Sequence, residues 1–411
     1  MNMRFYPGVL AGRIRIPSSK SLTHRALIAA SLSCGRSVLH HPLYCDDTLA
    51  TIDCLRKLGV NIKTQRDHLI VESNGRYTYH EMLDVKESAT TFRLLVCTIS
   101  IFIPDFTIAC DSRLIERLRT RDIASLQGLT FEWKSDCVHI TGSLQPTLYH
   151  VSTTITTQWA SGLALAMPLG AHCLEAIATD SDYVALSVDM MKKFGVDLIR
   201  EGDSYKTVGT YQPTELEIEV DYSSSAFFVG MMVFNPQLRI EGIGTSSLQP
   251  DFRIFEYLER MGVEFHHYTR VVKVSSVQFQ SCTIDLSQNP DLAPILAAVA
   301  AVSGKHIVLT GLEKLEYKES NRLVAIRESL FALGANIRIE DKSLIIDGRG
   351  TLHGDVTVDG FKDHRIIMSL VSIHHQINYP YTIIGCEHVR KSFPDFFKYF
   401  QKIGGIYESN L

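Results

Sequence analysis

One pattern of apolar and polar positions recurs along the whole chain. The segments LRKLGVNI, MKKFGVDL, LERMGVEF and LFALGANI place apolar residues at helical spacing, stop at a glycine and continue as an alternating run. SLQGLTFEW and FQKIGGIY have the same form, and the gaps between successive glycines are 67 to 72 residues, the glycines being Gly59, Gly128, Gly195, Gly262, Gly334 and Gly404. Glycine readily takes the left-handed conformation that ends a helix, and alternation is typical of a strand. Single helix–glycine–strand junctions are common in α/β proteins, but the regular spacing predicts six repeated α/β modules, three in each of two domains.

The pattern gives little sign of a linker or a membrane segment. The first half would end near VDYSSSAFF, around residue 220, where no Pro/Gly-rich stretch marks a boundary. The longest apolar run, near Leu292–Val302, is too short to span a bilayer. The N-terminal stretch MNMRFYPGVLAGRIRI lacks the layout of a signal peptide and is interpreted as a strand.

Composition narrows the class of protein. The 411 residues are 45% hydrophobic and 21% charged, as in globular proteins. A net charge of −4 argues against a general nucleic-acid surface but permits a local cationic site. Nine cysteines without a CxxC pair, and 16 histidines without HExxH or a finger spacing, predict neither a disulfide framework nor a metal site. We therefore expect a cytoplasmic protein.

Cations and hydroxyls recur where apolar helices are expected to begin. The stretches are PSSKSLTHRALIAASL with Lys20, Ser21 and Arg25, KESATTFRLL with Thr90 and Arg93, YKESNRLVAI with Lys318, Glu319 and Arg322, KDHRIIMSLV with His364 and Arg365, and VRKSFPDFF with Arg390 and Lys391. A helix N-terminus is already positive, so each cation there costs about 0.3–1 kcal/mol. Their recurrence favours an anionic ligand.

Blander interpretations exist for each stretch taken singly. A basic residue in a first turn is often solvated, and KES–R could be an ion-paired helix start. Asp291, in NPDLAPILAAVAAV, could simply cap its helix. A nucleotide-binding fold is not supported, because no GxxxxGK[ST] occurs and no GxGxxG follows a strand.

Together these motifs resemble the enolpyruvyl transferase family along the whole chain. IPSSKSLTHRAL is similar to the family's PGSKSxxNRAL, LYCDDTLATIDCLRKLGV to its S-D-D…L-x-x-LG segment, and KESNRL to its KE(T/S)DRL. DYVALSVDMMKKFGV, DHR and VRKSFPDFF also match. The resemblance implies an α/β (α+β) fold of two domains, with six βαβαββ-type units and an active site in the cleft between the domains. The N-terminal domain would be residues 19–218, and the C-terminal domain residues 1–18 with 219–411.

The resemblance also implies a reaction. The enolpyruvyl group of phosphoenolpyruvate would pass to the 5-hydroxyl of shikimate 3-phosphate, giving 5-enolpyruvylshikimate 3-phosphate and phosphate on the shikimate pathway to chorismate and the aromatic amino acids. No metal or organic cofactor, no nucleic acid and no membrane is implied, and the protein is expected to be a monomer. Both substrates carry phosphate and carboxylate groups, which suit arginine forks.

Roles for single residues follow from the resemblance alone. Asp291 is the expected base and Glu319 the expected proton donor, with Lys20 assisting, although which group moves which proton stays open. The residues implied for shikimate 3-phosphate are Lys20, Ser21, Arg25, Thr90, Thr156, Thr157, Gln158, Ser181, Tyr183, Asp291 and Lys318. Those implied for phosphoenolpyruvate are Lys20, Ala89, Arg93, Arg117, Gln158, Glu319, Arg322, Arg365 and Lys391.

The chain departs from the family pattern at several of these positions. Lys86-Glu87 replaces Gly-Asn, Leu118 replaces the proline after Arg117, Lys314 replaces an asparagine that touches the shikimate phosphate, Ser181-Asp182-Tyr183 shortens S-x-P-Y, and Thr156-Thr157-Gln158 replaces S-S-Q. We expect activity with altered substrate affinities. Ala89 stands where the family usually has glycine, and its methyl group is expected to narrow the site for glyphosate, a bulkier inhibitor that occupies the phosphoenolpyruvate position.

Two other functions remain open. The branch of the family that acts on UDP-N-acetylglucosamine has Lys-Asn in place of Lys20-Ser21 and usually a reactive cysteine on a mobile loop. Neither Cys110 nor Cys137 lies in a convincing copy of that loop. A binding protein that has kept the fold and lost turnover would be consistent with the changes at Lys86-Glu87 and Leu118.

Overall fold

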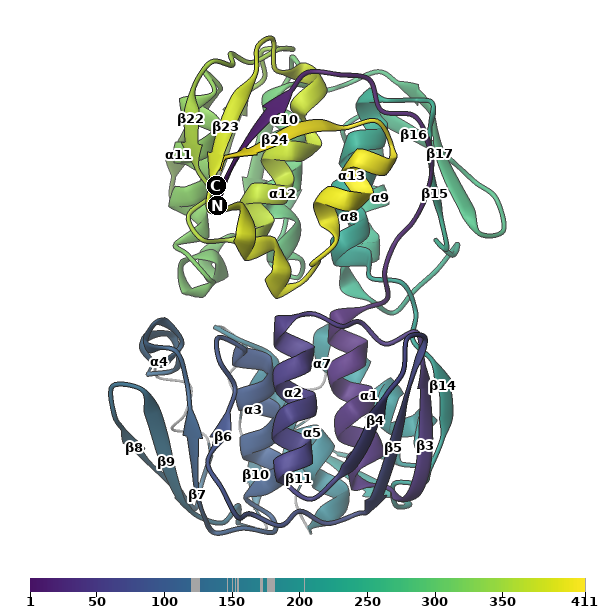
Figure 1. Ribbon diagram of the computed structural model, residues 1–411, viewed down its shortest axis with the longest axis vertical. Coiled ribbons are helices and arrows are strands. Elements are labelled where there is room, and N and C mark those ends of the chain that lie inside the picture. The colour runs from purple at the N-terminus through teal and green to yellow at the C-terminus, as the bar shows by residue number, and fades with distance from the viewer. Residues whose placement is uncertain are drawn as a thin grey trace. The chain divides into compact units, whose positions relative to one another are not determined.

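The computed structural model describes residues 1–119, 126–145, 147–149, 151, 153, 155–170, 173–175, 182–202 and 204–410. The chain forms two compact units, residues 18–219 and residues 1–17 with 220–411, which we call the N-terminal and C-terminal domains. The chain therefore begins in one domain, builds the other, and returns to the first (Figure 1).

The N-terminal domain alternates helices with short strands. Its elements are α1 (Lys20–Leu32), β3 (Cys34–His40), α2 (Asp46–Lys57), β4 (Asn61–Thr64), β5 (His68–Asn74), β6 (Leu83–Asp84), α3 (Ala89–Ile99), β7 (Asp105–Ala109), α4 (Ser112–Leu118), β8 (Leu129–Trp133), β9 (Cys137–Gly142), β10 (Leu148–Tyr149), α5 (Gln158–Ala166), η2 (Met167–Leu169), β11 (Cys173–Glu175), α7 (Asp182–Lys193), β12 (Asp197–Glu201), β13 (Ser204–Val208) and β14 (Glu215–Glu217).

The C-terminal domain repeats the same succession. Its elements are β1 (Asn2–Tyr6), β2 (Gly12–Arg15), α8 (Tyr222–Phe234), β15 (Leu238–Glu241), η3 (Pro250–Arg253), α9 (Ile254–Arg260), β16 (Val263–His267), β17 (Val271–Val277), β18 (Cys282–Asp285), η4 (Pro290–Leu292), α10 (Ala293–Ala301), β19 (His306–Thr310), η5 (Glu313–Tyr317), α11 (Arg322–Ala332), β20 (Asn336–Glu340), β21 (Ser343–Asp347), β22 (Thr357–Asp359), α12 (His364–Ser372), η6 (His374–Gln376), β23 (Tyr381–Ile384), η7 (Cys386–Lys391), α13 (Phe396–Lys402) and β24 (Ile406–Asn410).

The six predicted repeats are confirmed by the sheets and by the glycines. Within the described residues the strands form six sheets of four strands, each with one parallel pair and otherwise antiparallel neighbours. All six repeat glycines have positive φ, from 83° at Gly195 to 102° at Gly404, a conformation that glycine adopts without a side-chain clash. Residues 120–125, which lead toward Gly128, lie outside the described part of the chain.

The interpretation of the N-terminal stretch as one strand is wrong. Pro7 has no N–H for a ladder, and the stretch divides into β1 and β2 on either side of residues 7–11. β1 lies between β23 and β24, whereas β2 pairs in parallel with β15 in another sheet. Because β1 pairs with β24, the two ends of the chain lie side by side (Figure 1).

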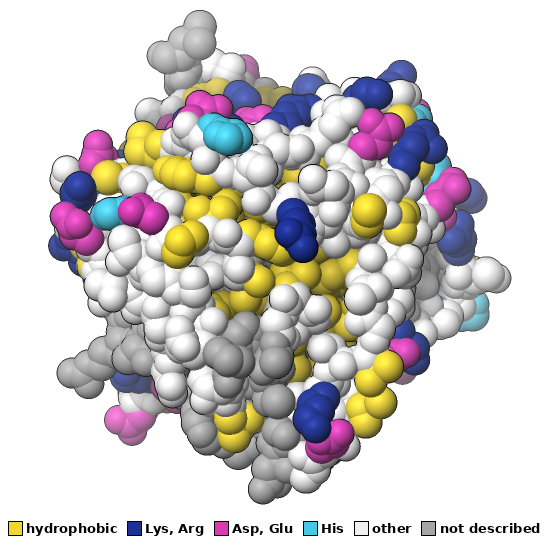
Figure 2. Space-filling view, turned by 90° about the horizontal axis from the view of Figure 1, so that it is seen from below, with side chains coloured by type: hydrophobic (Ala, Val, Ile, Leu, Met, Phe, Trp, Pro, Cys, Tyr) yellow, Lys and Arg dark blue, Asp and Glu magenta, His cyan; other side chains and the backbone are white. Residues whose placement is uncertain are grey.

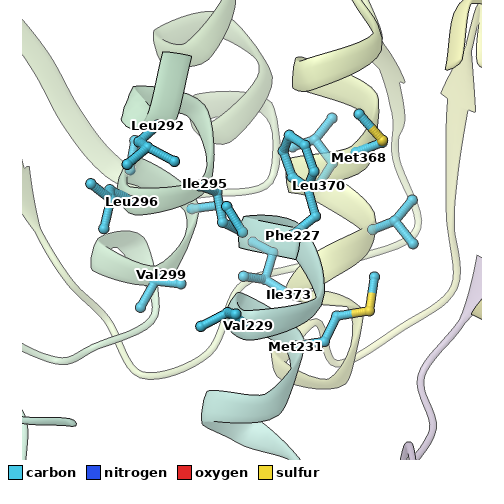
Figure 3. Close-up of a cluster of buried hydrophobic side chains, with 14 of the residues drawn as sticks. Phe227, Val229, Met231, Leu292, Ile295, Leu296, Val299, Met368, Leu370 and Ile373 are labelled. Atoms are coloured by element: carbon cyan, nitrogen blue, oxygen red, sulfur yellow. The ribbon is translucent and has the colours of Figure 1, made fainter. Parts of the chain in front are cut away.

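Each domain has its own apolar core. One cluster of buried side chains belongs to residues 22–218 and a second to residues 3–16 and 220–403. In the C-terminal domain, side chains of α8, α10 and α12 meet at the centre, where Phe227, Ile295 and Leu370 lie close together (Figure 3). Every residue of α10 is buried, which explains its uninterrupted apolar sequence.

The apolar run of α10 is thus part of a core. No helix among the described residues has the length and apolar character needed to cross a bilayer. One face of the molecule carries apolar side chains in its middle and has basic and acidic side chains scattered around them (Figure 2).

Candidate active site

The helices begin at the hydroxyl- and cation-rich stretches. Ser19 accepts a hydrogen bond from a backbone N–H of α1, and Ser88 does the same for α3. In the C-terminal domain, Asn321 caps α11 and Asp363 caps α12. The caps hold the first turns, so the cations of those turns have fixed positions on the backbone.

In the N-terminal domain, Lys20 and Arg25 differ in their partners. The Lys20 ammonium forms an ion pair with Asp47 at 2.8 Å. The Arg25 guanidinium donates hydrogen bonds to the Ser187 and Ser161 hydroxyls and to the backbone oxygen of Tyr183, at 2.8, 3.1 and 3.0 Å. None of the described carboxylates forms an ion pair with Arg25, and burial lowers its pKa to about 10. A buried cation held only by neutral acceptors favours an anion nearby.

Side chains from α3 and α5 form a second group. Arg93 donates to the Gln158 side-chain oxygen at 2.7 Å, and the Gln158 amide donates to the Thr90 hydroxyl at 2.8 Å. Thr156 accepts from the backbone N–H of Gln158 at 3.2 Å. The structure therefore brings together four predicted ligands from two repeats. Just before α3, Lys86 pairs with Asp84 and Glu87 with Arg113. The ion-paired helix start considered for KES–R occurs at α11, where Glu319 pairs with Arg322.

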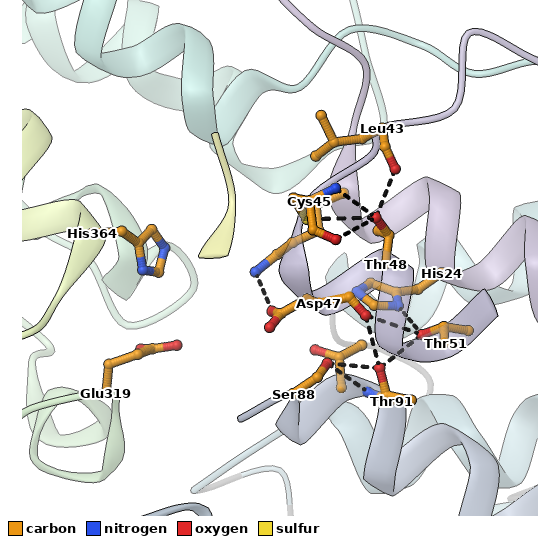
Figure 4. A network of polar contacts seen from close by, with 12 residues as sticks. His24, Leu43, Cys45, Asp47, Thr48, Thr51, Ser88, Thr91, Glu319 and His364 are labelled. Atoms are coloured by element: carbon orange, nitrogen blue, oxygen red, sulfur yellow. Dashed lines mark hydrogen bonds and ion pairs between the residues drawn. The ribbon is translucent and has the colours of Figure 1, made fainter. Parts of the chain in front are cut away.

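A buried polar network next to the Lys20–Asp47 pair includes the backbone oxygen of Asp47 (Figure 4). The Thr51 hydroxyl lies 2.8 Å from His24 Nδ1 and 2.7 Å from the Thr91 hydroxyl. Thr91 in turn donates to the backbone oxygen of Asp47 and lies 2.7 Å from the Ser88 hydroxyl. The network joins α1, α2 and α3 just behind their first turns, which fixes these turns relative to one another.

The other residues expected to bind substrate in this domain are described here by their positions on the helices. Ser21 lies in the first turn of α1 and Ala89 is the first residue of α3, Arg117 lies on α4, Thr157 precedes α5, and Tyr183 lies at the start of α7. Ser181 lies outside the described residues.

In the C-terminal domain, one buried arginine joins three carboxylates. Arg322 is 1% exposed and donates to Asp291 at 2.8 Å and to Glu319 at 2.6 Å. Its guanidinium also makes a two-point contact with Asp363, at 2.9 and 3.2 Å. Burial alone would lower the pKa of Arg322, but these carboxylates raise it above the ordinary value. The two carboxyl groups expected to move protons are thus held by the same fork.

Asp291 is surrounded by further cations. Lys318 lies 3.1 Å from one carboxylate oxygen and Arg365 3.3 Å from the other. Burial would raise the pKa of Asp291, but the charges of Arg365, Lys318 and Arg322 outweigh burial and hold that pKa below its ordinary value. No side-chain bond caps α10, so the alternative in which Asp291 serves as a helix cap does not hold.

Two further cations of this domain, Lys391 and Lys314, lie on the short 3₁₀ helices η7 and η5. Lys391 is buried at the end of η7. Lys314 on η5 donates to the backbone oxygen of Ser287 at 3.4 Å, and burial, together with the charge of Lys318, lowers its pKa. A lysine here adds positive charge where an asparagine would be neutral.

Sequence reasoning missed Asp47 and Asp363. Each lies inside a motif that was used, Asp47 in LYCDDTLATIDCLRKLGV and Asp363 in DHR, but a role for each appears only through its contact with Lys20 or Arg322. Asp363 is fully buried, caps α12 and accepts from Arg322, so that it fixes the orientation of both. An acid immediately before the basic pair of KDHR was the available signal.

Within the described residues, no group of three or more His, Cys, Asp or Glu side chains is arranged to hold a metal ion. The N-terminal domain brings together cations with hydroxyls and an amide, and the C-terminal domain brings together cations with the Asp291 and Glu319 carboxylates. Such a set suits substrates that carry phosphate and carboxylate groups.

Comparison with known proteins agrees with this chemistry. The family model described as EPSP synthase (3-phosphoshikimate 1-carboxyvinyltransferase) matches residues 6–400. The chain belongs to the EPSP synthase family.

Relatives and solved structures match over nearly the full length. A 3-phosphoshikimate 1-carboxyvinyltransferase of Clostridium kluyveri is 34% identical over 97% of this chain and 96% of its own. One from Clostridioides difficile is 33% identical over 98% of each. The EPSP synthase structure from Acinetobacter baumannii has a TM-score of 0.80 at 23% identity, covering 99% of this chain and 100% of its own.

A second solved structure shows that the fold extends beyond EPSP synthases. The enolpyruvyl transferase NikO of Streptomyces tendae has a TM-score of 0.79 at 15% identity, covering 99% of this chain and 98% of its own. The expected enolpyruvyl transferase fold is therefore confirmed, and the assignment within it comes from the EPSP synthase family model and the relatives.

Proposed function

We propose that this chain transfers the enolpyruvyl group of phosphoenolpyruvate to the 5-hydroxyl of shikimate 3-phosphate and releases phosphate. In the addition step, the hydroxyl oxygen bonds to C2 of phosphoenolpyruvate, C3 gains a proton and the hydroxyl loses one. In the elimination step, C3 returns a proton and the C2–O bond to phosphate breaks, which forms the enol ether. Each step moves two protons or a proton and phosphate, so acid and base groups are needed together.

The observation that carries the proposal is the buried Arg322 that holds both Asp291 and Glu319. It fixes two carboxyl groups in one place with different surroundings, since Lys318 and Arg365 also approach Asp291. Two carboxyl groups in different environments can divide the roles of acid and base.

The cations around Asp291 suggest how a weakly basic carboxylate becomes a base. Without ligand they hold the pKa of Asp291 below its ordinary value. A substrate phosphate or carboxylate that takes over Lys318 and Arg365 would withdraw this stabilisation from Asp291. The pKa of Asp291 would then rise, and the group would accept the hydroxyl proton more readily.

The substrate contacts remain proposals residue by residue. We assign shikimate 3-phosphate to the group around Ser21, Arg25 and Thr90, and the phosphoenolpyruvate anion to Arg117, Arg365 and the other cations named for it above. The support is the buried Arg25 cation, which has only neutral acceptors among the described residues. We place the reaction in the cytoplasm, because the eight described cysteine side chains are all free. We expect a monomer, because the family resemblance suggests a single chain.

A phosphate-release assay with phosphoenolpyruvate and shikimate 3-phosphate tests the proposal directly. Asp291→Asn and Glu319→Gln keep the side-chain shape but remove the proton-transfer chemistry. We expect kcat to fall by about 10²–10⁴ in each, with shikimate 3-phosphate binding retained in calorimetry. Glu313→Gln is the matched control, because Glu313 is an exposed carboxylate on η5 and should leave kcat unchanged.

Three outcomes would contradict the proposal. Wild-type rates in both variants would remove Asp291 and Glu319 from the mechanism. Binding of both substrates by the folded wild type without phosphate release would favour a non-catalytic binding protein. Release of phosphate with UDP-N-acetylglucosamine in place of shikimate 3-phosphate would favour the other branch of enolpyruvyl transferases.

A further inference from the structure

The start of α4 is tied to the segment that precedes α3. The backbone N–H of Asp111 donates to the backbone oxygen of Lys86 at 2.9 Å. One residue further on in the first segment, the Glu87 carboxylate forms an ion pair with Arg113. Two links, one through the backbone and one through side chains, therefore join residues 86–87 to residues 111–113.

α4 depends on such links. It has seven residues, Ser112–Leu118, and a helix of this length is not stable by itself. Its buried side, formed by Leu114, Ile115 and Leu118, packs on the core of the N-terminal domain. Arg113 lies outside this buried set, so the Glu87 ion pair restrains the helix at a point that core packing does not cover.

Arg117 lies one turn after Arg113 on the same helix. Residues four apart lie on the same side of a helix. If α4 rotates or shifts at Arg113, Arg117 therefore moves with it. The segment at the other end of the ion pair leads through Ser88 into Ala89, Thr90 and the rest of the first turn of α3. The ion pair thus connects two elements that both carry residues assigned to phosphoenolpyruvate.

Two departures from the family pattern meet at this point. Glu87 replaces an asparagine, and Leu118 replaces the proline that usually follows the arginine at position 117. Proline would fix φ directly after that arginine, whereas Leu118 is the buried last residue of α4. A charged link at Glu87 can restore part of the restraint that a missing proline leaves out.

We propose that the Glu87–Arg113 ion pair is a latch that positions α4 and thereby Arg117 for the phosphoenolpyruvate anion. Glu87 and Arg113 are positioning residues, and the inference rests on the proposed function in assigning Arg117 to that anion. Their side chains are 33% and 39% exposed, so the link is modest. Its loss should raise the KM for phosphoenolpyruvate by about three- to tenfold.

A direct effect of charge on the substrate would give a different result. If the Glu87 carboxylate simply repelled the anion, Glu87→Arg would lower the KM for phosphoenolpyruvate and Arg113→Glu would raise it. A latch requires both reversals to raise that KM, because each places like charges opposite one another. The double variant Glu87→Arg/Arg113→Glu restores opposite charges at these two positions. Because Asp111 also pairs with Arg113, at 3.6 Å, and would face a like charge, the KM should fall clearly below that of Arg113→Glu without returning fully to the wild-type value.

The experiment measures kcat and both KM values for the two single reversals and the double variant. We expect kcat and the KM for shikimate 3-phosphate to stay within about twofold throughout. Lys86→Asn is the matched control, because it breaks the neighbouring Lys86–Asp84 pair and leaves the latch intact. If a single reversal does not fold, Glu87→Gln, Arg113→Gln and their double variant supply the same cycle without reversed charge.

Hydrogen–deuterium exchange of the α4 backbone gives a second readout that needs no activity. Exchange over residues 112–118 should accelerate in each single variant and recover in the double reversal, even if the wild type released no phosphate and the proposed function failed. The inference is overturned if the double reversal is no better than the worse single variant. It is also overturned if the two single reversals shift the KM for phosphoenolpyruvate in opposite directions, or if neither alters the exchange of α4.

Discussion

Two buried arginines show how the surroundings of a cation determine what it does. Arg25 donates to hydroxyls and a backbone oxygen, so its charge is available to an anion that enters. Arg322 donates to Asp291, Glu319 and Asp363, so its charge organises acids. Both lie near the start of a helix, Arg25 in the second turn of α1 and Arg322 in the first turn of α11, and only their contacts separate their roles. Direct contact of Arg322 with phosphoenolpyruvate stays a prediction.

Ala89 is the residue at which a single methyl group should change inhibitor binding. It is the buried first residue of α3, where the family usually has glycine. In Ala89→Gly we expect glyphosate to become at least about tenfold more potent, since an overpacked methyl costs about 1–3 kcal/mol. Inhibition titrations against phosphoenolpyruvate measure the change.

The matched control for Ala89→Gly is Ala332→Gly. Ala332 is exposed at the end of α11, so this variant tests the general effect of introducing glycine into a helix. Glyphosate potency should be unaltered there. Unchanged potency in Ala89→Gly itself would show that the methyl group does not limit the inhibitor.

At the scale of elements, the network behind α1, α2 and α3 contains a histidine that must stay neutral. Burial lowers the pKa of His24 to about 3; the Asp47 carboxylate opposes this shift, and the charges of Lys20 and Arg25 add to it. The unfolded chain binds a proton near pH 6.5 and the folded chain does not until much lower pH. Stability is therefore fully present above pH 6.5 and is lost as pH falls from there toward 3.

We expect His24 to cost the N-terminal domain about 2 kcal/mol at pH 5 relative to pH 8. His24→Asn carries the asparagine of the family pattern and cannot titrate, so its unfolding free energy should depend less on pH by that amount. Urea unfolding followed by tryptophan fluorescence measures this, because Trp133 and Trp159 both lie in this domain.

His80→Asn is the control for the histidine experiment, since His80 is exposed in the same domain. It should leave the difference between pH 8 and pH 5 as in wild type. An equal pH dependence in His24→Asn and wild type would mean that His24 is not kept neutral by the fold.

Elements were predictable where their cause is local. At each helix–glycine–strand junction the helix ends at a residue with positive φ. A glycine in the sequence is the direct sign of such a residue. The cations at helix starts were visible for the same reason. The link from Asp363 to Arg322 spans 41 residues, and nothing in either segment specifies the other. The break at Pro7 was local as well, but the alternating residues on both sides concealed it.

At the scale of the whole molecule, the chain completes its C-terminal domain with its first residues. β1 lies between β23 and β24, and its Phe5 is fully buried against Tyr381, Phe397, Phe400 and Tyr407. The side chains of the two cores belong to separate sets, one in each domain. A change at residue 5 should therefore act on the domain formed mainly by residues 220–411.

Phe5→Ala should destabilise the C-terminal domain by about 3–5 kcal/mol, because it leaves a cavity in an aromatic cluster. Far-UV circular dichroism reports on both domains, whereas tryptophan fluorescence reports on the N-terminal domain alone. In urea, part of the dichroism signal should be lost at lower denaturant while the fluorescence midpoint stays that of wild type. Phe106→Ala, in the core of the N-terminal domain, is the matched control and should shift the fluorescence midpoint instead. If Phe5→Ala shifted both signals together, the two cores would unfold as one cooperative unit, and the separate cores would not correspond to separately stable domains.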